Sequence, residues 1–283
     1  LTVTPPLISL YFVYLDHFRD AVKATEAARR LVDRAPQNVN FRVMLAWSLA
    51  AQGQLDEALE LTRAAVAEEP HHPYGLPNLA HFLYASGADE EAVAHYRTVY
   101  DLTAEGKLRG ERWAAARDLA VALTSAGAAD EAMLLAEREA ENILEELDGN
   151  EPDSDQHLAL SQLRALEGLE PLAREHVDEA KRLGLFNPSS ILSLAQAHAL
   201  MGERESALAE VARALDSRYG DPFGPLYQPP FRPLSNDSRF LALFAPPHDT
   251  IDIEADHAHG TGKLTEIESE PETGGSAKEW WKE

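Results

Sequence analysis

A pair of sequence marks recurs six times within the first 218 residues and constrains the fold more than any other feature. The first mark is a large aliphatic residue followed by a small one, and the second is an Ala twelve residues after the small one. The pairs are Ile8-Ser9, Leu45-Ala46, Leu79-Ala80, Leu119-Ala120, Leu160-Ser161 and Leu194-Ala195, and the Ala residues are Ala21, Ala58, Ala92, Ala132, Ala173 and Ala207. Such self-similarity indicates an architecture of stacked repeats.

A Gly stands five residues before the second mark in every unit except the first, where Asp16 takes its place. These residues are Gly53, Gly87, Gly127, Gly168 and Gly202. Gly is favoured just after a helix because it adopts positive φ without steric cost. Each unit is therefore predicted to be a helix–turn–helix hairpin, in which the small residue and the Ala lie where helices cross closely.

These marks resemble those of the tetratricopeptide repeat family, whose unit has about 34 residues. The resemblance covers residues 3–218 and implies an all-α fold, a right-handed α-solenoid of about six repeats. Two intervals between repeats are longer, so we expect extended connections at residues 103–112 and 144–156. Arg164 and His198 stand at positions that are normally apolar in the family, which makes the fifth and sixth repeats the least regular.

The composition changes after residue 218. We expect residues 219–245 to form an extended connection, wrapped on the last repeat, and a capping helix. The stretch 230–244 is similar to a terminal segment that follows such repeats in bacterial regulators, and Phe240, Leu241 and Phe244 would cover the apolar end of the solenoid. Residues 246–283 are acidic and poor in apolar side chains, which predicts a disordered tail that ends with Trp280-Trp281.

No catalytic motif emerges, so we expect no enzyme, no cofactor and no metal site. The chain has no Cys, which excludes thiol nucleophiles and Cys-ligated metals. The pairs Glu91/His95 and His176/Glu179 have ligand-compatible spacing but are interpreted as exposed helix pairs. His71-His72-Pro73 is interpreted as an ordinary link between repeats, and the His and Asp residues of the tail lack the preorganisation that a metal site needs.

The chain is strongly acidic, with 25 Lys and Arg against 48 Asp and Glu and a formal net charge of −23. Phosphate groups need a basic surface, so nucleic acid is not an expected partner, and a basic or apolar peptide is favoured over an acidic one. Salt adaptation of the source organism is an alternative explanation of the charge. The apolar stretch of residues 7–15 is about half of what a membrane span needs, so we expect a cytoplasmic protein without membrane insertion.

The resemblance also implies a partner-binding surface, because first helices line the concave groove in this family. Carried over by position, the groove residues are Asn40, Val43, Trp47, Tyr74, Asn78, His81, Tyr84, Arg117, Val121 and Thr124. Trp, Tyr, His and Arg side chains combine a large area with a polar tip, which suits binding hot spots. The alternative is that Trp47, Tyr74 and His81 only pack between helices.

The favoured function is a non-enzymatic adaptor that binds a peptide or helix of a partner protein in this groove. The alternative is a sensory or regulatory region of a larger bacterial signalling protein. A further hypothesis is a self-contact, in which the tail places Trp280-Trp281 in the groove of its own chain.

Overall fold

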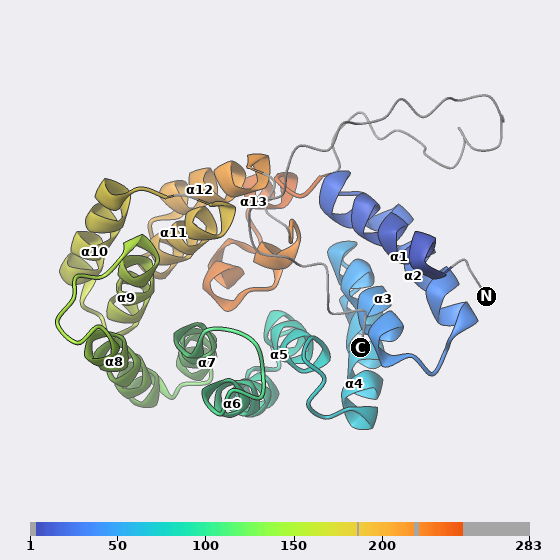
Figure 1. The fold of residues 1–283 in the computed structure, drawn as a ribbon, viewed down its shortest axis with the longest axis horizontal. Coiled ribbons are helices and arrows are strands. Elements are labelled where there is room, and N and C mark those ends of the chain that lie inside the picture. The colour runs from blue at the N-terminus through green and yellow to red at the C-terminus, as the bar shows by residue number, and fades with distance from the viewer. Residues whose placement is uncertain (1–3, 186, 218–220, 246–283) are drawn as a thin grey trace. The chain divides into compact units, whose positions relative to one another are not determined.

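The computed structural model describes residues 4–185, 187–217 and 221–245. Contacts within the chain divide it into two units, Leu1–Ala245 and Pro246–Glu283. The expected acidic tail and its Trp pair lie in the second unit, outside the described residues. All regular elements of the described residues are helices (Figure 1), as the repeat pattern predicts.

Six consecutive helical hairpins account for most of the first unit. Each hairpin pairs an odd-numbered helix, the first helix of a repeat, with the even-numbered helix that follows. The helices are α1 (Thr4–Phe12), α2 (Ala21–Arg34), α3 (Val39–Ala51), α4 (Leu55–Glu68), α5 (Gly75–Ala85), α6 (Asp89–Ala104), α7 (Arg112–Ser125), α8 (Ala129–Glu146), α9 (Ser154–Leu166), α10 (Glu170–Leu183), α11 (Pro188–Leu200) and α12 (Arg204–Asp216). In the described residues, no helix has the length and apolarity to cross a membrane.

The sequence marks lie at the close contacts between these helices. The second-helix Ala residues are buried in all six repeats, and the small residues from Ala46 to Ala195 are fully buried. The five turn glycines have φ between +72° and +86°, at Gly202 and Gly87 respectively, as expected of residues that end a helix. The sequence therefore located both the hairpins and their turns.

The first repeat departs from the pattern. A π-helical turn, η1 (Val13–His17), extends α1 and contains Asp16, so no residue at that place ends the helix. The positive φ falls instead on Arg19, at 50°. Leu7 and Tyr11 are buried where the pattern predicted Ile8 and Ser9, because the helix presents a different face to α2. The π turn thus occupies the place where the other repeats have a Gly.

The two irregular features predicted for later repeats are present. The connections at 105–111 and 147–153 are the long ones, inside the predicted ranges. Arg164 donates two hydrogen bonds to Glu167, of 2.8 and 2.7 Å. His198 is buried, and its Nδ1 lies 2.5 Å from a carboxylate oxygen of Glu203. Each of these polar side chains thus has a carboxylate partner nearby, although Nε of Arg164 is buried without a hydrogen-bond partner.

After the last hairpin, the chain contacts earlier repeats as well as the sixth one. Two 3₁₀ turns, η2 (Gly224–Leu226) and η3 (Pro229–Leu234), lie among the first helices, where η3 contacts α5, α7 and α11 (Figure 1). We call residues 221–234 the insert segment. The short helix α13 (Ser238–Ala242) follows it. This path differs from the connection expected to wrap on the last repeat alone.

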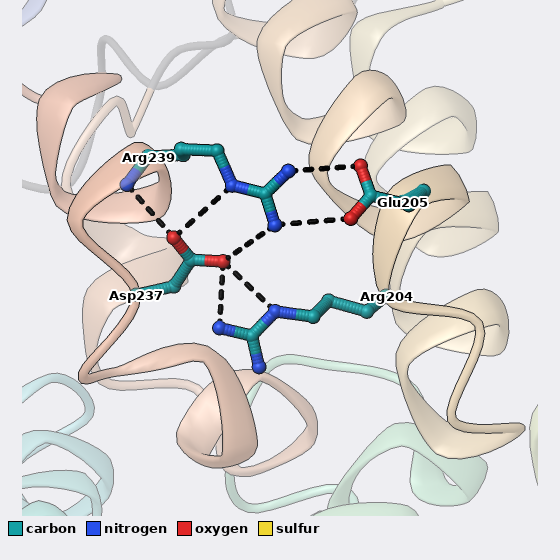
Figure 2. A network of polar contacts seen from close by, with 4 residues as sticks. All are labelled: Arg204, Glu205, Asp237 and Arg239. Carbon is teal, nitrogen blue, oxygen red and sulfur yellow. Dashed lines mark hydrogen bonds and ion pairs between the residues drawn. The ribbon is translucent and has the colours of Figure 1, made fainter.

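An ion-pair network attaches α13 to α12 (Figure 2). Asp237 caps α13 by accepting from the amide of Arg239, at 2.8 Å, and pairs with Arg204 at 2.6 Å. Arg239 in turn donates two hydrogen bonds of 3.0 Å to Glu205. Hydrogen bonds from Arg239 and Arg204 hold the pKa of Asp237 well below its usual range. The network therefore connects α13 to the start of α12.

Whether α13 caps the solenoid stays a prediction, but its apolar face is buried in part. Phe240 is fully buried against Phe231 and Phe244, with ring centroids 6.0 and 5.1 Å apart. Leu241, which was predicted to share this face, is 48% exposed. At the other end of the solenoid, Arg19 donates a hydrogen bond of 3.2 Å to the carbonyl of Leu243, so the first repeat touches the cap.

Substitution of Phe240 tests the cap. Phe240→Ala should lower the free energy of unfolding by about 3–5 kcal/mol, because it empties a fully buried aromatic site. Leu241→Ala should change it by less than about 0.5 kcal/mol, since that side chain is half exposed. Urea unfolding followed by circular dichroism measures both. Equal effects of the two substitutions would contradict the assignment.

Candidate partner-binding groove

The family resemblance predicts a groove lined by first helices, and the residue after the small one in each first helix belongs to that predicted lining. These positions hold Trp47, His81, Val121, Gln162 and Gln196 in repeats two to six. They recur once per repeat, on the same side of the first helix, since each follows the same packing position. Each is described below with the contacts that it makes.

An aromatic cluster occupies the groove at the second and third repeats. The ring of Trp47 stacks on Phe82, with centroids 5.7 Å apart, and meets the ring of Tyr227 edge-on at 6.0 Å. Phe82 also packs edge-on against Tyr227, at 5.3 Å. The Tyr227 hydroxyl donates to the carbonyl of Ala50. Trp47, which was predicted to bind a partner, thus packs against Tyr227 of the insert segment.

Tyr84 is engaged by the same segment. The guanidinium of Arg232 lies over the Tyr84 ring, 4.3 Å from its centroid, and donates to Asp89 at 2.6 Å. The Tyr84 hydroxyl is 2.8 Å from the hydroxyl of Ser125. Only 3% of Tyr84 is exposed. A cation–π contact and an ion pair therefore hold the second half of the insert segment.

Arg117 is buried at the centre of a polar network. It donates to Gln162 at 2.9 Å, to Gln196 at 2.8 Å and to Asp118 at 2.8 Å. Gln196 passes the network on by donating to Gln228 of the insert segment, at 2.8 Å. A buried guanidinium needs this many acceptors to offset its lost hydration. The network links repeats four, five and six to the insert segment.

His81 forms a pair with Asp118, with Nε2 3.4 Å from Oδ2. Burial opposes ionisation of Asp118, but Arg117 and His81 outweigh it and lower the pKa of that carboxyl. The buried Tyr96 ring lies 5.7 Å from His81. No serine or threonine hydroxyl is bonded to His81, so the pair lacks the nucleophile of a hydrolytic triad in the described residues. There is likewise no group of three or more His, Asp or Glu side chains suited to a metal ion in the part of the chain that the structure describes.

The carboxyl groups of Asp16 in the first repeat and Asp221 in the insert segment interact electrostatically. Asp221 accepts the amide of Gly224 at 3.1 Å, and a Cβ on that Gly would lie 2.5 Å from the other Asp221 oxygen. Burial raises the pKa of Asp221 to about 6, although amide hydrogen bonds and His81 oppose the rise. Burial, and then the charge of Asp221, raise the pKa of Asp16 to about 7. Both carboxyls also raise the pKa of the buried Tyr11 beside them.

Asn40 and Val43 have structural contacts. Val43 is buried with Val39 and Ala65 between α3 and α4. Asn40 accepts at 3.0 Å from Nε2 of His72, whose Nδ1 accepts the amide of Gly75 at 2.9 Å. His72 therefore caps α5, and burial lowers its pKa, which favours the neutral tautomer that this arrangement requires. The link between repeats two and three owes its His to this cap.

The remaining predicted residues are at least partly accessible. Tyr74, at the start of α5, is 39% exposed, and Thr124 is exposed on α7. Asn78 and Val121 are half-buried on the same two helices. On α5 and α7, the predicted residues that remain accessible to solvent are these four and the partly exposed His81. Their role in binding stays a prediction.

The insert segment is a fixed part of the fold. Phe223, Phe231 and Leu234 are each no more than 3% exposed, and burial of such a side chain contributes about 1.5–3 kcal/mol. The ion pair of Arg232 with Asp89 adds to these contacts.

Part of the chain matches a known family. Residues 18–75 and 49–101 match the model of the tetratricopeptide repeat. These residues therefore contain tetratricopeptide repeats, and similar helical hairpins continue through the rest of the described residues up to α12. Such repeats are generally protein–protein interaction modules, and proteins built from them are typically non-enzymatic scaffolds.

The chain is similar in fold to solved structures of repeat proteins. A Podosopora anserina protein with nearly identical tetratricopeptide-like repeats is 22% identical, with a TM-score of 0.53 over 65% of this chain and 97% of that one. Pseudomonas aeruginosa PilF is 20% identical, with a TM-score of 0.49 over 74% of this chain and 89% of its own. A search of curated proteins gave no match.

Some groove residues escaped the sequence analysis although a signal existed. Gln162 and Gln196 stand directly after the small residue, as Trp47 and His81 do, so the position rule applied to repeats five and six would have found them. Asp221, Gln228 and Arg232 carried no such signal, because they belong to no repeat. Only the path of the insert segment brings them into the groove.

The Asp16–Asp221 pair predicts a pH-dependent stability. Both pKa values are raised in the folded chain, so the protonated forms favour folding, and this contribution is lost as the pH rises through about 6 to 7. The melting temperature should therefore fall between pH 5 and pH 8, and Asp16→Asn should make the fall smaller. Thermal unfolding across this pH range measures it. An identical fall in the variant would contradict the role of the pair.

Proposed function

We propose that this protein is a non-enzymatic adaptor that binds an extended segment or a helix of a partner protein along α5 and α7. The contact surface consists of Tyr74, Asn78, His81, Val121 and Thr124. The observation that carries the proposal is that Tyr74, a residue type suited to binding hot spots, is 39% exposed at the edge of a groove that is otherwise filled.

The family supports the proposal, since its repeats generally serve protein–protein interaction. A partner of basic or apolar character fits best, because the formal net charge of −23 repels acidic peptides. Trp47, Tyr84 and Arg117 have a different role in this proposal. They hold the insert segment and thereby keep α5 and α7 in place.

The experiment compares capture of partners by the wild-type protein and by a Tyr74→Ala/Asn78→Ala variant. Both side chains are accessible, so the variant should fold, as circular dichroism will verify. We expect a protein that the wild type retains from native lysate to be lost by about tenfold or more, which corresponds to about 1.4 kcal/mol of binding free energy.

The matched control is Asp56→Ala/Glu60→Ala, which alters two exposed residues of the second helix α4. This variant should retain the partner as the wild type does. Equal retention by all three proteins would reject the proposed surface.

A further inference from the structure

Several exposed apolar side chains belong to the second helices α8 and α10. Among the described residues, Met133, Leu134 and Leu144 of α8 are 42%, 60% and 42% exposed. Leu169 and Leu172, at the start of α10, are 43% and 37% exposed. Several exposed apolar residues on one helix favour an interaction site, whereas single exposed residues are ordinary.

The helical period brings acidic residues onto the same side of α8. At about 100° per residue, Met133, Leu144, Glu137, Asp130, Glu141 and Leu134 fall within an arc of about 100°. We call these six residues the α8 outer face. Three apolar and three acidic side chains share this face, with the acidic ones between Leu144 and Leu134 around the helix, so the face is not purely charged.

The acidic residues of this face form no ion pairs with basic side chains among the described residues. In the described part of the chain, Asp130, Glu137 and Glu141 have no ion-pair partner, although neighbouring carboxylates such as Glu131 and Glu139 are paired with Arg97 and Arg112. Glu137 and Glu141 add to the effect of burial in raising the pKa of Glu167. Their negative potential therefore reaches the end of α9, close to the exposed Leu169.

A pocket adjoins this face on the side of α6. It has a volume of about 330 Å³, and Leu134 and Leu135 of α8, Leu119 of α7 and Tyr100 of α6 line it. Four charged residues, Arg97, Asp101, Glu131 and Arg138, complete the lining. The Arg138 guanidinium lies 5.8 Å from the Tyr100 ring centroid. The Tyr100 hydroxyl donates to the buried Glu139 at 2.7 Å, which fixes the ring as a wall of the pocket. Such a pocket suits one apolar anchor side chain of a ligand.

We propose that the α8 outer face and this pocket form a second docking site, which binds a basic amphipathic helix of another protein. An apolar residue of that helix enters the pocket beside Leu134, and its Lys or Arg residues face Glu137 and Glu141. The match of apolar anchors with opposite charge is the chemistry of helix-in-groove recognition. The site lies on second helices, so it is separate from the proposed surface on α5 and α7.

The probe for the test is a synthetic helical peptide of Leu, Ala and Lys with one apolar face, and isothermal titration calorimetry measures its Kd. We expect Leu134→Glu to weaken binding by about tenfold or more, because it places a charge where the anchor enters. Glu137→Lys/Glu141→Lys should weaken it by a similar factor. An analogue with Glu in place of Lys should not bind the wild type.

Controls separate this site from the charge of the whole chain and from the groove. Asp56→Lys/Glu60→Lys makes the same change in net charge on exposed positions of α4 and should leave the Kd within about twofold. Tyr74→Ala/Asn78→Ala should also bind the peptide normally, so failure of one proposal does not imply failure of the other.

Two outcomes would overturn the proposal. The first is that the peptide binds Leu134→Glu, or binds Glu137→Lys/Glu141→Lys, as it binds the wild type. The second is that the wild type forms a dimer that Leu134→Glu dissociates while no peptide binds, because the face would then serve contact between two copies of this chain. Analytical ultracentrifugation of both proteins measures this second outcome.

Discussion

The close approach of helices through small residues is the constraint on which the rest of the structure depends. Ala46, Ala80, Ala120, Ser161 and Ala195 are fully buried where consecutive helices cross. A larger side chain at such a crossing would force the helices apart and cost about 1–3 kcal/mol. Because the same small contact recurs once per repeat, the first helices stack in a constant direction and the residues after these positions form one row.

Side chains of that row contact the chain's own insert segment. Arg117 is buried among Asp118, Gln162 and Gln196, and the last of these continues to Gln228. Removal of the segment would leave polar groups of the row without partners and expose the Trp47 and Phe82 rings. The family resemblance predicts that this row binds a partner. In this chain several residues of the row contact the insert segment instead, and the proposed binding surfaces lie beside it and on the second helices.

The sequence predicted what is local and repeated. Hairpins, turn glycines and buried Ala residues follow from backbone and packing rules that act within one repeat, so Gly53 and Ala58 could be placed from the sequence. The path of residues 221–234 could not, because it depends on long-range contacts such as that of Tyr227 with Ala50. The π turn at Asp16 was also missed, since its sequence carries no distinctive residue. For the site, the position rule named Trp47 and His81, whose role in binding stays a prediction, but the contact of Tyr84 with Arg232 of the insert segment could not be predicted from the repeats.

The hydrogen bond between Arg19 and Leu243 joins residues at opposite ends of the repeat array. In an open solenoid each repeat contacts only its neighbours, so repeats can unfold and refold nearly independently. Here the insert segment and the cap connect repeats one, two, three and six directly, which makes the stability of each depend on distant ones. The array should therefore behave as one cooperative unit, whose native contacts are completed only after the last residues of the segment have been synthesised.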